Sequence, residues 1–168
     1  RLNQLTKCEL HQGVVAEVIL PQLPGHEALI EFVTKLSSNP LILMLDSIQD
    51  PRNLGACLRC ANAAGVNCVV VNKDGSAPIN AVVHKTSSGA INQLKIFQVT
   101  NLVRTIKALK DKKLWVLGLD GRVSTSIYDV NLIDSTVIVM GAEDKGLRQL
   151  IKKTCDQLVT IPMIGNVE

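Results

Sequence analysis

The chain has 168 residues, a net charge of +3 and 46% hydrophobic residues, which is enough for one folded domain and a short additional segment. Aromatic residues make up only 2%, which argues against an RNA-binding module that stacks bases on exposed rings. A core of valine, isoleucine, leucine and alanine is typical of a buried parallel sheet. The five cysteines are scattered, and no apolar run approaches the roughly 20 residues of a membrane span. We therefore expect reduced thiols, a cytoplasmic location and no membrane contact.

The first 39 residues differ in pattern from the rest of the chain. Residues 13–18 could form a terminal strand, and residues 20–25 contain two prolines, as in a linker. A short helix is expected at residues 27–36, and it should end at the Ser-Ser-Asn-Pro sequence of residues 37–40.

From residue 40 onward, strands and helices alternate. Residues 41–45 are continuously apolar, as expected for a strand buried on both faces. Asn53 is expected to cap a helix that runs to Ala64 and ends at Gly65. The remaining expected elements are strands at 67–71, 94–99, 114–119, 136–140 and 158–161, and helices at 80–87, 101–112 and 147–155. This order predicts an α/β fold, with a mostly parallel sheet and helices on both faces.

Ligands of such sheets bind beyond the carboxyl ends of the strands, where the loops at 46–53, 141–146 and 162–168 should lie. In the helix expected from Asn53 to Ala64, Gly55 lacks a side chain, so another group can approach the backbone. Arg59 follows Gly55 by four residues and lies on the same face of this helix. A helix N-terminus with an arginine suits a phosphate. The spacing equally allows a capped helix with a surface arginine.

The second loop places Glu143 between Gly141 and Gly146. It is neither a Walker loop nor a GxGxxG dinucleotide turn, which disfavours a small-molecule enzyme that uses a nucleotide. Its glycines allow a ligand to contact main-chain groups, although an ordinary strand-to-helix turn with a solvated carboxylate fits as well. The third loop begins with the Ile-Pro-Met sequence of residues 161–163 and is uninformative by itself.

Together the three loops resemble the SpoU (TrmH-like) branch of the SPOUT methyltransferases. The Asp-Pro-x-Asn-x-Gly-x-x-x-Arg string at 50–59 resembles that family's first motif, and Met-Gly-Ala-Glu-x-x-Gly at 140–146 resembles the second. The sequence at 161–163 resembles the start of the third motif, and the resemblance covers residues 41–168.

Three further stretches favour the subgroup that methylates a guanosine ribose of bacterial 23S rRNA. They are HQGVVAEV at 11–18, DGSAPIN at 74–80 and CDQLVTIPM at 155–163.

The resemblance implies a fold, an assembly and a domain organisation. The fold is a SPOUT-type sheet with a deep trefoil knot, and the assembly is a homodimer. Residues 1–18 correspond to the remnant of an N-terminal RNA-binding domain, residues 19–39 to a linker and residues 40–168 to the catalytic domain. The family's third motif continues into a Ser-Leu-Asn-Val-Ser string and a helix. We expect this tail, which completes the knot, to be missing from the 168 residues.

The resemblance also implies an activity, the S-adenosylmethionine-dependent 2′-O-methylation of a ribose in RNA. Asn53, Arg59 and Glu143 match the family's catalytic positions. The cofactor-binding positions are Gly141 and Ile161, through main-chain atoms, with Met163 and Leu119 on the same wall.

Arg59 can be interpreted in two ways. The family assigns its arginine the role of base, but a guanidinium stays protonated up to a pH of about 12. A clamp that binds a phosphate and aligns the hydroxyl is the alternative. A tRNA methyltransferase of the same family and an inactive RNA-binding relative also remain open.

Other polar patterns are expected to be structural. Cys57 and Cys60 have redox-like spacing, but Cys57 lies about one turn inside its helix, and no second cysteine pair could complete a zinc site. We therefore expect no metal. The lysine run formed by Lys107, Lys110, Lys112 and Lys113 is either a solvated helix face or a contact to RNA phosphates.

Overall fold

A computed structural model describes residues 2–6, 13–15, 17 and 22–165 of the chain. The helices are α1 (Leu2–Thr6), α2 (His26–Thr34), α3 (Pro51–Ala63), α4 (Ala81–Thr86), α5 (Leu102–Asp111) and α6 (Gln149–Thr154), with short 3-10 helices η1 (Ala90–Asn92) and η2 (Ile127–Asp129). The strands are β1 (Leu41–Asp46), β2 (Cys68–Asn72), β3 (Ile96–Val99), β4 (Trp115–Leu119), β5 (Thr136–Gly141) and β6 (Gln157–Val159). The alternation expected from the sequence is confirmed.

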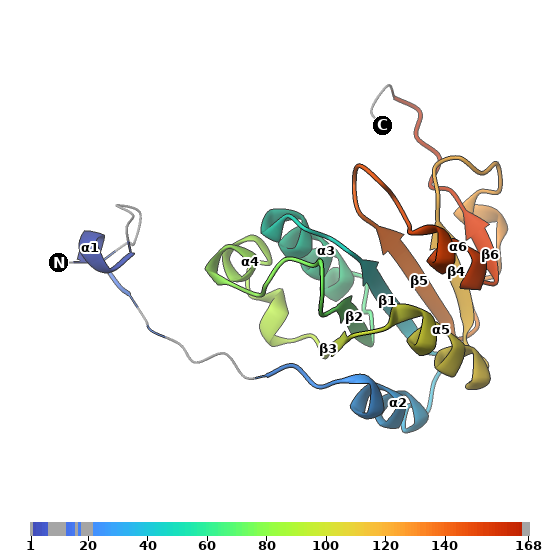
Figure 1. Cartoon of the computed structure of the whole chain (residues 1–168), viewed down its shortest axis with the longest axis horizontal. Helices are drawn as coiled ribbons and strands as arrows, with labels where there is room; N and C mark the ends of the chain where they lie inside the picture. The colour runs from blue at the N-terminus through green and yellow to red at the C-terminus, as the bar shows by residue number, and fades with distance from the viewer. Residues whose placement is uncertain (1, 7–12, 16, 18–21, 166–168) are drawn as a thin grey trace.

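The strands form one six-stranded sheet in the order β3-β2-β1-β5-β4-β6, and every neighbouring pair is parallel. β1 and β5 lie at its centre, in a register that pairs Leu41 with Thr136 and Asp46 with Gly141 (Figure 1). Because all strands run the same way, their carboxyl ends and the loops that follow them share one edge.

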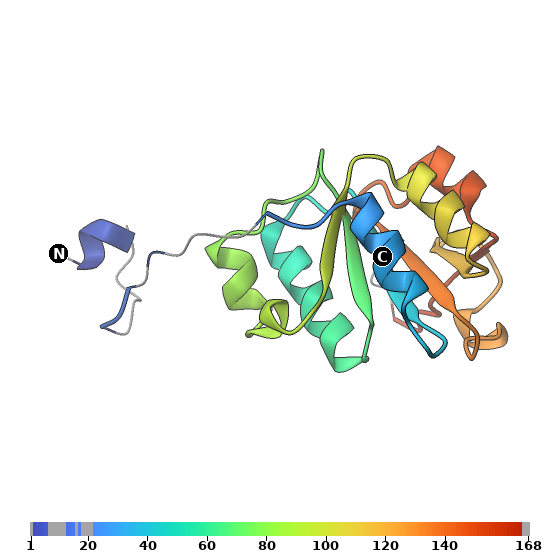
Figure 2. The ribbon, with the colours of Figure 1, turned by 90° about the horizontal axis from the view of Figure 1, so that it is seen from below.

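Alternate residues of the central strands enter two separate cores. Ile42 and Met44 pack with α2, α5 and α6 on one face of the sheet. Leu43 and Leu45 pack with α3 and α4 on the other face. Figure 2 shows these two groups of helices on opposite sides of the strands. Burial on both faces explains why the run at 41–45 is apolar without alternation.

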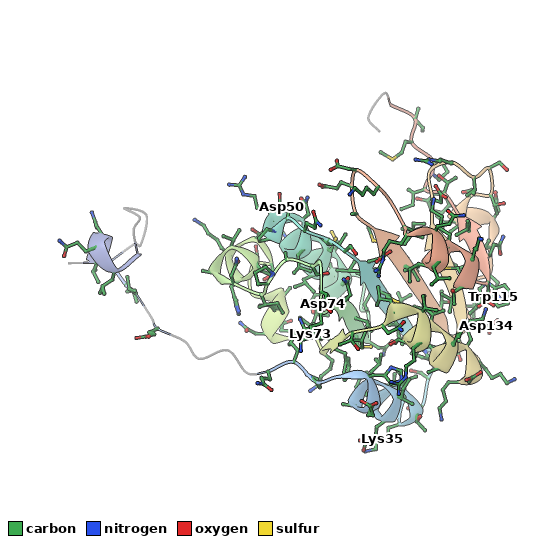
Figure 3. All side chains as sticks on the ribbon, in the orientation of Figure 1. Lys35, Asp50, Lys73, Asp74, Trp115 and Asp134 are labelled. Atoms are coloured by element: carbon green, nitrogen blue, oxygen red, sulfur yellow. The ribbon has the colours of Figure 1, made fainter. Side chains whose placement is uncertain are left out.

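The start of α3 differs from the prediction. Asp50, which Figure 3 labels, is the N-cap in place of Asn53. Its side chain accepts a hydrogen bond of 2.7 Å from the backbone N–H of Arg52. Pro51 occupies the first turn, where its missing N–H leaves no bond unmade. The prediction of Asn53 as the cap was wrong because an aspartate followed by a proline provides a stronger start three residues earlier. The caps expected at Asn80 and Asn101 are confirmed.

Gly55 allows a close approach, but the approaching group belongs to the chain itself. A Cβ at this position would lie 2.7 Å from the Thr86 Cβ and 3.1 Å from the Val83 carbonyl oxygen. The missing side chain therefore lets α3 pack against α4, and the close approach expected at Gly55 is made by another helix of the same chain.

The N-terminal part of the described chain contributes to the core at α2. Leu29 and Val33 of this helix are buried against the sheet, so part of the predicted linker packs on the domain. Residues 13–15 and 17 are not in a strand, and the rest of the predicted terminal strand at 13–18 lies outside the described residues. No helix in the described ranges is long and apolar enough to cross a membrane.

We expect Gly55→Ala to lower the free energy of unfolding by about 1–3 kcal/mol, because the new methyl group overpacks the contact between α3 and α4. Gly121→Ala is the matched control, since a Cβ there would meet nothing within 4 Å. Urea denaturation of both variants measures the effect. Equal stability of the two variants would contradict the packing role of Gly55.

Candidate active site

Three loops meet at the carboxyl edge of the sheet. They follow β1, β5 and β6, and the loop between β5 and α6 extends beyond the end of its strand (Figure 1). The chain after β6 leaves the sheet in the same direction, toward the last described residues. The loops expected to carry the chemistry therefore share one edge of the molecule.

Asn53 and Glu143 are brought together there. Asn53 lies in the first turn of α3, and its side-chain amide donates a hydrogen bond to the Glu143 carboxylate from 90 residues further along the chain. Asn53 is half-buried and Glu143 is exposed. Because Asp50 caps the helix, the Asn53 side chain is free to join the first and second motifs.

Arg59 lies elsewhere on the same helix. It is exposed and follows Asn53 by six residues, which corresponds to about 120° around the axis at roughly 100° per residue. Within the described chain, the fold joins Asn53 to Glu143 but not to Arg59. A role for Arg59 beside these residues requires a substrate that spans two sides of α3 or a second protein chain.

Gly141 ends β5, and its lack of a side chain has a structural reason. A Cβ there would lie 2.1 Å from the Gly146 carbonyl carbon and 2.2 Å from the Leu147 nitrogen. The backbone N–H of Gly146 also donates to the Ala142 carbonyl at 2.7 Å. The loop therefore folds back onto its own start, with Glu143 held between its two glycines.

The other predicted cofactor contacts lie at the same edge. Leu119 ends β4 in register with Val159 of β6 and is half-buried. Ile161 follows β6 and is 45% exposed, and Met163 is 67% exposed. The edge thus offers an apolar surface beside main-chain groups.

Sequence reasoning missed the group that holds the second loop in place. Asp46 is completely buried at the end of β1. Its carboxylate accepts from the Arg148 Nε at 2.7 Å and from the Arg148 backbone N–H at 3.0 Å. The sequence does contain a signal, since Asp46 directly follows the apolar run at 41–45. A carboxylate buried at such a position requires a partner.

A second ion pair ties α6 to the end of β4. The Lys152 ammonium lies 2.5 Å from the Asp120 carboxylate, and both side chains are largely buried. The hydrogen bond from Lys152 lowers the pKa of the Asp120 carboxyl, although burial opposes the effect. Arg148 and Lys152 are four residues apart, so two successive turns bind carboxylates at this edge.

The structure gives little support for redox chemistry at Cys57 or for a metal site. Burial, followed by the charges of Cys60 and Glu143, raises the pKa of the Cys57 thiol, whereas a redox-active cysteine needs a lowered value. No group of three potential metal ligands occurs among the described residues. Lys110 of the lysine run binds Asp156 at 2.7 Å. Lys107, Lys112 and Lys113 are exposed.

The comparison with protein families decides the classification. Residues 40–168 match the model of the SpoU rRNA Methylase family. The chain belongs to this family. The match covers the whole sheet and all three loops. The motifs at residues 50–59, 140–146 and 161–163 therefore lie within the region that the family model matches.

Curated relatives are similar along nearly the whole chain. The 23S rRNA (guanosine-2′-O-)-methyltransferase RlmB of Haemophilus ducreyi is 45% identical over 99% of this chain and 68% of its own length. RlmB of Pseudomonas aeruginosa is 48% identical over 94% of this chain and 64% of its own length. The chain therefore spans about two thirds of these relatives.

Solved structures of the family share the fold. AviRb from Streptomyces viridochromogenes, crystallised with AdoMet, has a TM-score of 0.72 at 21% identity and covers 80% of this chain and 55% of its own. An RNA methyltransferase of the TrmH family from Porphyromonas gingivalis has a TM-score of 0.69 at 28% identity, over 77% of this chain and 53% of its own. The likeness to AviRb concerns the fold alone.

We expect Glu143→Gln to speed the alkylation of Cys57 by less than about tenfold at constant pH, because the substitution removes one charge that raises the pKa of that thiol. Mass spectrometry of iodoacetamide-treated protein measures the rate at each cysteine. Cys68, which burial raises to a pKa of about 12, is the internal control. An unchanged rate at Cys57 would contradict the placement of Glu143 beside α3.

Proposed function

We propose that the chain is the catalytic part of an S-adenosylmethionine-dependent methyltransferase that modifies a guanosine ribose 2′-hydroxyl of 23S rRNA. The hydrogen bond between Asn53 and Glu143 carries the proposal, because it joins the first two motifs at the ligand-binding edge of the sheet. The substrate follows from the similarity to the RlmB relatives, whose names specify guanosine and 23S rRNA.

The residues at the carboxyl edge fit the proposed cofactor. S-adenosylmethionine would supply a methyl group from a sulfonium, because the neutral thioether that remains is a good leaving group. The exposed Ile161 and Met163 and the half-buried Leu119 offer apolar contact to an adenosine. Gly141 brings no side chain that would shield the neighbouring main-chain groups. A neutral adenosine needs no charged partner on this wall.

Asn53 and Glu143 orient the nucleotide in this proposal. The hydrogen bond between the two side chains holds each of them in place. The remaining oxygen atoms of Asn53 and Glu143 are therefore preorganised to contact a nucleotide. Glu143 is exposed and can accept a hydrogen bond from a ribose hydroxyl. The pair would thus orient a ribose hydroxyl at the edge of the sheet that carries the proposed cofactor-binding residues.

Arg59 acts on the substrate from another side of α3. Its exposed guanidinium is suited to bind an RNA phosphate through two parallel hydrogen bonds. We favour this clamp over proton abstraction, because guanidinium remains protonated at neutral pH. Its separation from Asn53 supports a site that a second subunit helps to form.

The assembly we propose is a homodimer with a trefoil knot. Ile164, which lies beyond the residues assigned to the cofactor, exposes an apolar side chain that a second copy could bury. The backbone of Thr160 bonds to Thr125 and Ile127 in the connection between β4 and β5, each at 2.8 Å. This connection reaches the chain after β6, as a loop that encloses a later segment must. We place the enzyme in the cytoplasm, with the rRNA.

The domain organisation follows from the same family. We propose that residues 40–168 are the catalytic domain, that residues 19–39 connect it to an RNA-binding domain, and that residues 1–18 belong to the end of that domain. The core contacts of α2 would fix the connecting segment to the catalytic domain.

The direct test is methyl transfer from radiolabelled S-adenosylmethionine to unmodified 23S rRNA by the intact protein, followed by mapping of the labelled nucleotide. We expect one labelled guanosine, with the label on its ribose. In a parallel reaction with unmodified tRNA, label on tRNA but not on rRNA would favour the tRNA-specific alternative. Binding of rRNA without any transfer would favour an inactive relative.

We expect Arg59→Lys to lower kcat/KM by about 100-fold, because lysine keeps the charge but cannot form the paired hydrogen bonds of a guanidinium. Arg104→Lys is the matched control, since Arg104 lies on α5 and pairs with Glu27 at 3.5 Å. The measurement is initial-rate methylation at several RNA concentrations. Near-normal rates with Arg59→Lys would rule out the clamp.

A further inference from the structure

The carboxylate of Asp46 binds one residue twice. One oxygen accepts from the Arg148 Nε at 2.7 Å, and the other accepts from the Arg148 backbone N–H at 3.0 Å. Asp46 is completely buried, whereas 56% of the Arg148 side chain is exposed. Arg148 is also the N-cap residue of α6. The start of α6 is thereby fixed to the end of β1.

The two loops of the candidate site are joined at two points. Asp46 opens the loop that leads to α3, and Arg148 closes the loop that carries Glu143, so their ion pair joins the loops at the base. The bond between Asn53 and Glu143 joins them at the outer end. Gly141 and Gly146 pack against each other, so the second loop closes on its own base.

The Asp46 side of this junction is itself constrained. Ser47 has a φ of 64°, a left-handed conformation that is uncommon without glycine. Its backbone N–H donates to the Asn72 side chain at 2.8 Å, and its hydroxyl donates to Asp46 at 3.2 Å. Asn72 ends β2 and is buried. The carboxylate is therefore presented to Arg148 in one orientation.

We propose that Asp46 is a positioning residue for methyl transfer, which acts through Arg148 to hold Glu143 and Gly141 at the sites of the nucleotide and the cofactor. This inference rests on the proposed function. It assigns a role to a residue outside the three motif strings, and to a group that touches neither reactant.

Asp156 provides a matched control for the chemistry of Asp46. Its carboxylate also binds one backbone N–H, that of Val116 at 2.9 Å, and one cation, Lys110 at 2.7 Å. It is largely buried but lies at the amino end of the sheet, just before β6. Asp156→Asn removes the same charge from a similar environment, far from the candidate site.

The experiment compares Asp46→Asn and Asp156→Asn in the intact protein. We expect Asp46→Asn to lower kcat/KM by about 100-fold, since small displacements of positioning groups have effects of this size. We expect Asp156→Asn to lower it by less than about threefold, at a comparable loss of stability. In an Asp46→Asn, Glu143→Gln double variant, the losses should be far from additive, because Asp46 acts through Glu143.

Amide hydrogen exchange gives a second readout. The N–H of Gly146 bonds to Ala142 and not to Asp46, so faster exchange there in Asp46→Asn reports a displaced loop. If Asp46→Asn does not fold, Arg148→Lys tests the same pair from its exposed end, with the backbone bond retained. Equal kinetic losses in the Asp46 and Asp156 variants would overturn the proposal. An inactive wild-type protein would instead contradict the proposed function.

Discussion

The buried charge of Asp46 is the constraint on which the candidate site depends. A carboxylate taken out of water is strongly unfavourable unless it is paired and hydrogen-bonded. Here the partner is Arg148, 102 residues away, and the pairing fixes the loop between β5 and α6 against the end of β1. The contact of Asn53 with Glu143 at the outer end of the same loops then becomes possible.

A division between strands and strand ends organises the whole molecule. The strands are apolar on both faces, so their side chains form the two cores of the domain. These side chains do not hold the loops of the candidate site in place. Polar side chains at the strand ends determine the loops. Asn72 at the end of β2 and Asp120 directly after β4 are buried or nearly so, as Asp46 is, and each binds a neighbouring loop or helix. These bonds fix the starts of the loops at the carboxyl edge of the sheet.

The sequence was sufficient for the alternation of strands and helices, because short apolar runs such as residues 41–45 suit strands that are buried on both faces. It was not sufficient for local choices between competing signals. Asp50 displaced Asn53 as the cap of α3, and the group that approaches the backbone at Gly55 is α4. Both depend on tertiary contacts that no local pattern contains. The partner of Asp46 was also invisible, since it lies on a distant element. That Asn53, Arg59 and Glu143 contact the substrate stays a prediction.

Binding of S-adenosylmethionine followed by amide chemical shifts tests most directly whether the carboxyl ends of β4, β5 and β6 form one cofactor site. We expect the amides of Leu119, Gly141 and Ile161 to shift together with a single dissociation constant. The amide of Trp115, at the amino end of β4, should remain unchanged (Figure 3). Shifts confined to one of the three strand ends, or centred on the amino edge of the sheet, would contradict a single cofactor site.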